Sequence, residues 1–300
     1  MISQTNLDAA WQQMIDEVSY PVYIKPLHYY HDDVVENRHD VEHPAKGITN
    51  TGRLCEFYGI VVDRWNDGEL STIATVTGLY DTIPAASVYD SIRKDLEQLG
   101  IANEPCDIYI SGNGGKHQLS IKLNGLNWLS PKGDITMHMI VTTSVDGTTK
   151  HTLRVAAVDE DGYEICGVGG AVFNMSTRHT KTIHQRHAGF SVIINGLVAH
   201  WNDTIIPTMM IMCDSQFDKA MAVSILTALM EDIDLPEKHQ DNMLLTYNQI
   251  NAQTDMFDIC HQLSKYLSDE LADKHERLSE FKTRISKQSD KLVKKYLKSI

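Results

Sequence analysis

The chain has 300 residues, of which 42% are hydrophobic and 22% charged, and its formal net charge is -13 at pH 7. This composition is typical of a globular protein with one large domain or two small ones. No apolar run reaches the length of about 20 residues that a membrane-spanning helix needs, and the N-terminus lacks the basic start and apolar stretch of a signal peptide. We therefore expect a cytoplasmic protein with no membrane partner.

Residues 1–52 predict a helix followed by an arm. The helix is expected over residues 7–18, where apolar side chains recur at helical spacing at Leu7, Trp11, Met14 and Ile15. Pro21 ends it. Residues 21–47 combine proline, acidic residues and histidines without a helical or strand period, which predicts a loop or an extended arm rich in His and Asp.

Residues 53–200 predict an α+β core domain. Two short strands flank the Asp67-Gly68 hairpin turn, and residues 87–99 have the apolar face of an amphipathic helix with Gly100 as its C-cap. Further strands are expected at residues 107–110, 118–123, 136–143, 152–158, 163–166 and 170–174. We expect them to pair as a central antiparallel sheet with flanking helices.

Residues 201–300 predict a helical C-terminal region that ends in a basic helix. A helix is expected over residues 214–230, with Asp214 or Ser215 as its cap. From residue 237 onward, the chain has no Gly and no Pro, and the helical spacing continues. The narrow apolar stripe of residues 271–300 indicates either a helix docked on the body or an oligomer seam. The fold class is thus α+β, with a helical C-terminal third.

An acid-free cationic segment, residues 176–187, follows the predicted strands. In an acidic chain, such a segment is either neutralised by its neighbours or kept for an anionic partner. Neutralisation would pair Arg178 and His179 with Asp159, Glu160, Asp161 and Glu164. The alternative is contact with nucleic-acid phosphates through Lys150, His151, Arg154, Arg178, His179, Lys181 and Arg186. The basic C-terminal segment offers a second contact through Lys287, Lys291, Lys294, Lys295 and Lys298.

The same part of the chain resembles a known family. The resemblance is carried by GDITMHMIVTTSVDGTTKHTLRVAAV (residues 133–158), EIC (164–166), STRHTK (176–181) and the upstream GLYDTIPAASVYDSIRKDLEQLG (78–100). These pieces are similar to the phage- and plasmid-borne domain-of-unknown-function family numbered 932, and the similarity covers residues 53–187. The chain departs from that family's Cys-x-Asn pattern, because Gly167 and Val168 follow Cys166. The resemblance implies a phage or plasmid origin and hence a host-cell cytoplasm, but no reaction.

Histidines of the N-terminal arm raise the question of a metal site. Imidazole and carboxylate groups are suitable ligands for zinc or a harder divalent ion, and the candidates are His28, His31, His39 and His43. Their spacing matches no metal motif such as HExxH, and no nucleophile motif such as GxSxG is present. We therefore expect no cofactor, with a divalent metal as the alternative, and the sequence favours a binding protein over an enzyme.

Three functional hypotheses follow. The first is a phage- or plasmid-encoded nucleic-acid-binding protein, for single-stranded DNA, that acts in replication, recombination or DNA protection. The second is an acidic protein-interaction factor that binds and modulates a host or phage enzyme, using its C-terminal helices. The third is a metal-dependent enzyme that uses the N-terminal His/Asp cluster. Homo-oligomerisation through the C-terminal segment is compatible with each of them.

Overall fold

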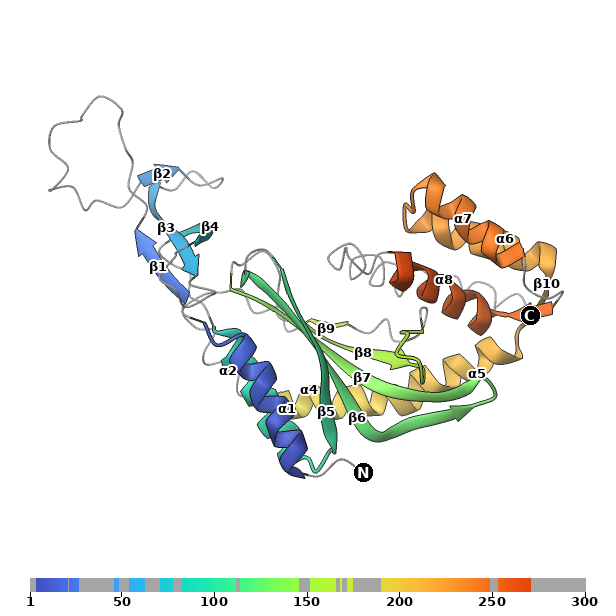
Figure 1. Ribbon diagram of the computed structural model, residues 1–300, viewed down its shortest axis with the longest axis horizontal. Coiled ribbons are helices and arrows are strands. Elements are labelled where there is room, and N and C mark those ends of the chain that lie inside the picture. Colours follow the sequence, from blue (N-terminus) through green and yellow to red (C-terminus); the bar gives the residue numbers. More distant parts are fainter. Residues whose placement is uncertain are drawn as a thin grey trace, which may run out of the picture.

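The computed structural model describes residues 4–20, 22–26, 46–48, 54–62, 71–77, 83–111, 114–145, 152–165, 168, 172–174, 190–248 and 253–270. These residues form an α+β fold in which antiparallel sheets are flanked by helices and a helical C-terminal region follows (Figure 1). The predicted fold class is confirmed. Within the described residues, no helix combines the length and the apolar character needed to span a membrane.

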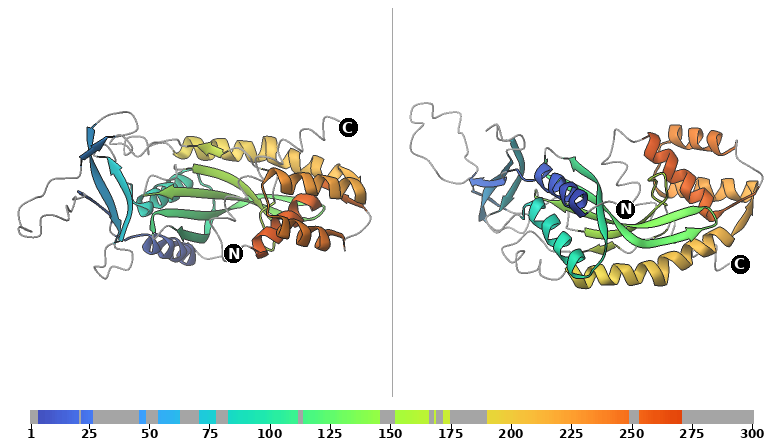
Figure 2. Two further views of the ribbon diagram at one scale, coloured as in Figure 1. Left: turned by 90° about the horizontal axis from the view of Figure 1, so that it is seen from above. Right: turned by 60° about the horizontal axis from the view of Figure 1, so that its bottom comes forward.

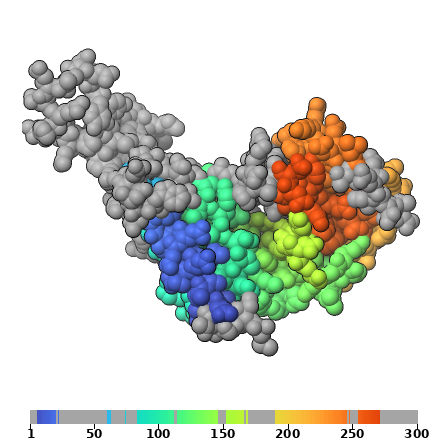
Figure 3. Space-filling view, in the orientation of Figure 1, coloured from blue at the N-terminus to red at the C-terminus, as the bar shows by residue number. Residues whose placement is uncertain are grey.

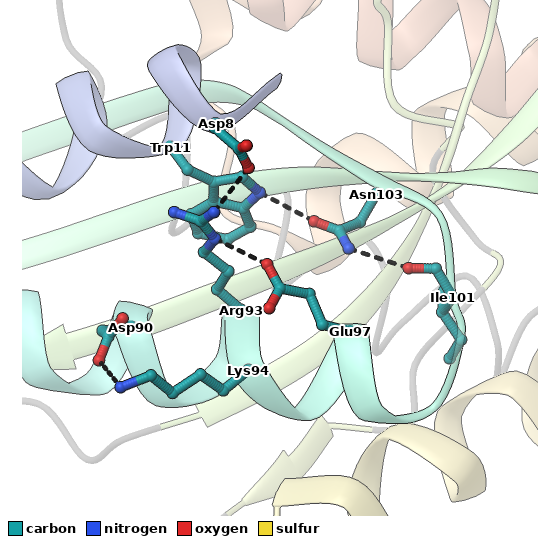
Figure 4. A network of polar contacts seen from close by, with 8 residues as sticks. All are labelled: Asp8, Trp11, Asp90, Arg93, Lys94, Glu97, Ile101 and Asn103. Atoms are coloured by element: carbon teal, nitrogen blue, oxygen red, sulfur yellow. Dashed lines mark hydrogen bonds and ion pairs between the residues drawn. The ribbon is translucent and has the colours of Figure 1, made fainter. Parts of the chain in front are cut away.

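Two N-terminal helices pack against the start of the central sheet. Helix α1 (Gln4–Glu17) confirms the predicted helix, and its buried Trp11 donates a 2.9 Å hydrogen bond from Nε1 to Oδ1 of Asn103. Helix α2 (Ala85–Gln98) buries the predicted apolar face. Arg93 of α2 joins the two helices, because it pairs with Asp8 at 2.7 Å and with Glu97 at 2.9 Å (Figure 4).

Among the described residues, four strands form a small N-terminal sheet. They are β1 (Val22–Pro26), β2 (Lys46–Ile48), β3 (Leu54–Val62) and β4 (Ser71–Thr77). The predicted antiparallel pairing of β3 with β4 is confirmed. The prediction of a loop or arm over residues 21–47 was wrong for β1 and β2, which pair antiparallel with β3. Their backbone hydrogen bonds come from β3, a distant partner that no local period reveals.

The central sheet has the strand order β5-β6-β7-β8-β9 among the described residues. Its strands are β5 (Asn103–Ser111), β6 (Lys116–Ser130), β7 (Gly133–Ser144), β8 (Thr152–Val158) and β9 (Val172–Asn174). All neighbouring pairs are antiparallel. The strand predicted at 163–166 is reduced to an isolated bridge between Glu164 and Val158, because the chain turns sharply at Gly162, whose φ is +89°.

Side chains alternate between two faces of this sheet. On β6, Leu119, Ile121 and Leu123 are fully buried and belong to the main apolar core. That core also contains side chains of α2 and of the C-terminal helices, so helices cover this face. The intervening residues of β6, such as Ser120 and Lys122, point to the opposite face.

Two irregularities bend the central sheet. On β5, Cys106 is an extra residue, because Pro105 pairs with Ile121 and Asp107 already pairs with Ser120. On β6, residues 123–126 lie opposite a single residue of β7, Met137, and this segment contains Gly125 with a φ of +84°. Bulges of this kind bend a strand and increase its twist.

The C-terminal region begins with a long helical rod that runs along the sheet (Figure 2). It consists of α4 (Phe190–His200), the π-helical turn η2 (Trp201–Ile205) and α5 (Ile206–Asp214). Pro207 at the start of α5 has no backbone N–H to donate. The wider turn accommodates this, since the N–H of Ile206 bonds to the carbonyl of Trp201, five residues earlier.

Three helices complete the described chain, namely α6 (Lys219–Asp232), α7 (Glu237–Asn248) and α8 (Met256–Glu270). Strand β10 (Gln216–Asp218) precedes α6 and strand β11 (Gln253–Asp255) precedes α8, and the two strands pair antiparallel as a ribbon. The prediction that Asp214 or Ser215 caps a helix over 214–230 was wrong. The cap is Asp218, whose Oδ1 accepts a 2.8 Å hydrogen bond from the Met221 N–H.

Candidate functional site

A cleft of about 670 Å³ opens on the concave face of the central sheet, opposite the helices. Strands β5 to β8 form its floor and one wall, and residues 159–164, after β8, form the other wall. Figure 3 views this side of the molecule, with β5 in teal and residues 159–165 in yellow-green on either side of the hollow. A concave site with a few convergent polar groups is the usual place for a bound ligand.

The floor combines a polar cluster with an apolar patch. Lys122 of β6 pairs in register with His138 of β7, and Ser120 lies two residues before Lys122 on the same face. His138 Nδ1 lies 3.1 Å from Ser120 Oγ. Beside them, Ile140, Ala156 and Val158 form a small buried cluster of their own. The floor therefore offers both hydrogen-bonding groups and apolar surface.

His138 is uncharged at neutral pH. Burial, followed by the nearby Lys122 charge, lowers the pKa of His138 to about 4, although Glu164 acts in the opposite direction. A base with so low a pKa is poorly matched to proton abstraction near pH 7. The Ser120–His138 pair is consequently better suited to hydrogen bonding with a ligand than to activating a serine nucleophile.

The first wall is the bulged part of β5. Glu104, Cys106 and Asp107 line the cleft there. Burial raises the pKa of the Cys106 thiol, as do the nearby acidic groups, so the thiol is not activated as a nucleophile. Within the described part of the chain, the side-chain carboxylates of Glu104 and Asp107 form no hydrogen bond or ion pair with another residue. Both carboxylates are available to a ligand.

The second wall is held by internal contacts. Asp159 accepts a 2.7 Å hydrogen bond from the Tyr163 N–H and lies 2.6 Å from Nε2 of His261 in α8. Glu160 Oε1 accepts a 3.0 Å hydrogen bond from the Asp134 N–H. The carboxylates of this wall are thus engaged in fixing its shape, in contrast to those of β5.

An ion pair links β8 to the second wall. Arg154 contacts Glu164 through both terminal guanidinium nitrogens, Nη1 and Nη2, and the Nη2–Oε2 distance is 3.0 Å. The side chains are only 11% and 7% exposed. A bidentate, largely desolvated pair of this kind has a defined geometry. Arg154 is therefore committed to the cleft wall.

The formal charges around the cleft are predominantly negative. Five carboxylates and two basic groups line it. They are Glu104, Asp107, Asp159, Glu160 and Glu164 against Lys122 and Arg154. Because His138 is neutral, the cleft attracts positive groups and repels phosphate.

Most residues predicted from the sequence to form a site lie outside the described residues. This holds for the nucleic-acid contacts Lys150, His151, Arg178, His179, Lys181 and Arg186, for the basic tail with Lys287, Lys291, Lys294, Lys295 and Lys298, and for the metal candidates His28, His31, His39 and His43. Arg154 is the predicted contact that the structure describes. Within the described ranges, no group of three or more His, Cys, Asp or Glu side chains is placed to hold a metal ion.

Sequence reasoning missed the floor and the first wall of the cleft. Glu104, Lys122 and His138 form one row across three strands, but they are far apart in the chain. The only local signal was the alternation of polar and apolar residues along β6, which identifies the face but not the neighbours.

Comparison with known proteins adds no further constraint. No protein-family model matches the chain, and no curated protein or solved structure is similar to it. The resemblance to the phage- and plasmid-borne family therefore stays a prediction, and the cleft must be interpreted from its own chemistry.

Proposed function

We propose that the protein is an interaction factor whose concave cleft binds an exposed basic segment of a partner protein. The observation that carries the proposal is the lining of the 670 Å³ cleft, in which five carboxylates face two basic groups. Lysine or arginine side chains of the partner would meet the available carboxylates of Glu104 and Asp107. The aliphatic parts of those side chains would lie over Ile140 and Ala156.

The charge of the cleft favours this function over nucleic-acid binding at the same place. Phosphate groups would approach Glu104 and Asp107, and the binding energy of nucleic acid comes largely from phosphate contacts with basic residues. Arg154 is already engaged with Glu164. Binding of single-stranded DNA elsewhere on the chain remains the prediction of the sequence, and it is an alternative outcome of the experiment below.

Fluorescence anisotropy with labelled peptides tests the proposal. An arginine- and glycine-containing peptide should bind, and its affinity should fall as salt is added because the charges are screened. A glutamate-containing peptide of the same length should not bind. Free spermine, as a competitor, distinguishes a cleft that accepts any polyamine from one that needs a peptide. A labelled single-stranded DNA forms the third arm.

Variants locate the interaction. Glu104→Gln combined with Asp107→Asn should raise the Kd for the arginine peptide about tenfold, as expected when two partly exposed charge contacts are lost. Asp241→Asn removes a carboxylate from an exposed position in α7, outside the cleft, and should leave the Kd within about twofold. Equal affinity of the double variant and the wild type would refute the cleft as the binding site, and tight binding of DNA alone would favour the nucleic-acid hypothesis.

A further inference from the structure

Helix α8 contacts the rest of the molecule through two different faces. Its apolar face is buried in the main core with α5 and α6, through residues such as Phe257, Ile259 and Leu263. A polar stripe runs along another face, at the helical spacing of Asp258, His261, Lys265 and Asp269. Each of these four side chains contacts the central sheet or the turn that follows β8.

The polar stripe begins at the hairpin between β6 and β7. Lys132 of that hairpin lies 2.8 Å from Asp258 and 2.9 Å from Asp255, which is 2% exposed. Asp255 also accepts a 2.8 Å hydrogen bond from the Asp258 N–H at the start of α8. The N-terminal end of α8 is therefore fixed to the sheet.

Further along the stripe, three side chains of α8 hold the second wall of the cleft. His261 Nε2 lies 2.6 Å from Asp159 Oδ2. Asp269 accepts a 3.0 Å hydrogen bond from the Tyr163 hydroxyl, and the Lys265 ammonium lies 4.9 Å from the centre of the Tyr163 ring. Residues 159–163 are thus bound to α8 at both ends of the turn.

His261 is the contact with the greatest consequence for the cleft. Asp159 lines the cleft, and its other carboxylate oxygen closes the turn by accepting the Tyr163 N–H at 2.7 Å. An ionised carboxylate only accepts hydrogen bonds, so His261 donates from Nε2. Without that donor, the Asp159 carboxylate would lose the bond that fixes its orientation relative to α8.

We propose that His261 is a positioning residue, which holds Asp159 and the second cleft wall in place, so that helix α8 and the cleft respond to each other. The part of this inference that concerns binding to the cleft rests on the proposed function. A partner that moves α8 would change the affinity of the cleft for a basic segment. By thermodynamic reciprocity, occupation of the cleft would change the binding of that partner to the same degree.

Two variants of His261, with a control at the next residue, separate positioning from bulk packing. His261→Leu keeps a side chain of similar size and removes the donor. His261→Gln keeps a donor close to the place of Nε2. Gln262→Leu, one residue along α8 and partly exposed, serves as the matched control. Hydrogen exchange of residues 159–165 is measured first, because it needs no ligand, and thermal unfolding reports on the global fold.

In the leucine variant, the amides of Gly162 and Tyr163 should exchange about tenfold faster than in the wild type, because local opening becomes easier. The Kd for the arginine peptide should rise about tenfold as well. His261→Gln should restore both quantities to within about twofold of the wild type, and Gln262→Leu should change neither. If the leucine variant does not fold, His261→Asn replaces it, since its amide is too short to reach Asp159.

Two results would overturn the inference. One is wild-type exchange of residues 159–165 in the variant without a donor. The other is equal impairment of the leucine and glutamine variants, which would indicate packing rather than a hydrogen bond. If the wild-type protein binds no arginine peptide, the proposed function fails, but the exchange measurements still decide the role of His261.

Discussion

The two faces of the central sheet are built from adjacent residues with opposite environments. Toward the helices, Ile121 and Met139 are completely buried within one large apolar core. Toward the cleft, their neighbours Lys122 and His138 lie in a polar cluster beside a small apolar patch. The helix-covered face therefore holds the fold together, whereas the cleft face carries groups that stability alone does not require.

The charged residues of the cleft face fall into two groups: engaged charges, which contact another charged or polar side chain, and available charges, which do not. Arg154 and Glu164 contact each other, and Asp159 contacts His261, so these groups fix the shape of the wall. Glu104 and Asp107 line the opposite wall without such contacts among the described residues. Substitutions on the two faces, and in the two classes of charge, should therefore have effects of different size and kind.

The largest effect is expected on the helix-covered face. Ile121→Ala should lower the free energy of unfolding by about 4 kcal/mol, because it removes buried methylenes and leaves a cavity. Lys122→Ala, one residue along β6, should lower it by less than about 1 kcal/mol. Urea denaturation measures both. Similar losses in the two variants would contradict the distinction between the faces.

A smaller effect is expected from the engaged charges of the cleft face. Arg154→Met should lower the free energy of unfolding by about 3 kcal/mol, because Glu164 would then be buried without the guanidinium. Adding Glu164→Leu should recover most of the loss, since an apolar pair of similar volume avoids the buried charge. Urea denaturation of the two variants checks this. A double variant as unstable as the single one would show that the pair stabilises the fold in its own right.

The sequence predicted those parts of the fold that depend on local periodicity. The buried stripe of α2, with Val88, Ile92 and Leu96, was recognisable because one helix face carries it. The strands on either side of residues 144–152 were recognisable from their β-rich composition. By contrast, β1 depends on pairing with β3, for example Tyr23 with Val61, and a pairing across so many residues leaves no local pattern.

The candidate site was less accessible from sequence for the same reason. The predicted site consisted of basic residues because these cluster along the chain. The residues of the cleft, by contrast, come together only through the register of paired strands. Glu104, Lys122 and His138 become neighbours only through two antiparallel pairings, and the β5 bulge brings Asp107 opposite Ser120. Arg154 was singled out as a phosphate contact, yet its environment is set by Glu164, whose position depends on a turn.

The smallest effect is a dependence of stability on pH, which comes from His138 on the cleft face. Burial and the Lys122 charge lower the pKa of His138 from its ordinary value of 6.5 to about 4, so the unfolded chain takes up a proton at a higher pH than the folded chain. The contribution of neutral His138 to the free energy of unfolding is therefore fully present above pH 6.5 and is lost as the pH falls toward 4. Between pH 7.5 and pH 5, this histidine should account for a loss of about 2 kcal/mol.

Denaturation of the wild type and of His138→Gln across that range isolates the contribution, because all other titrating groups are shared. The difference in free energy of unfolding should change with pH in the direction that favours the variant in acid. Ser120→Ala, which leaves the imidazole buried, should retain most of the wild-type pH dependence. Parallel curves for the wild type and His138→Gln would mean that the imidazole is hydrated, and that the cleft floor is open to water rather than enclosed by its walls.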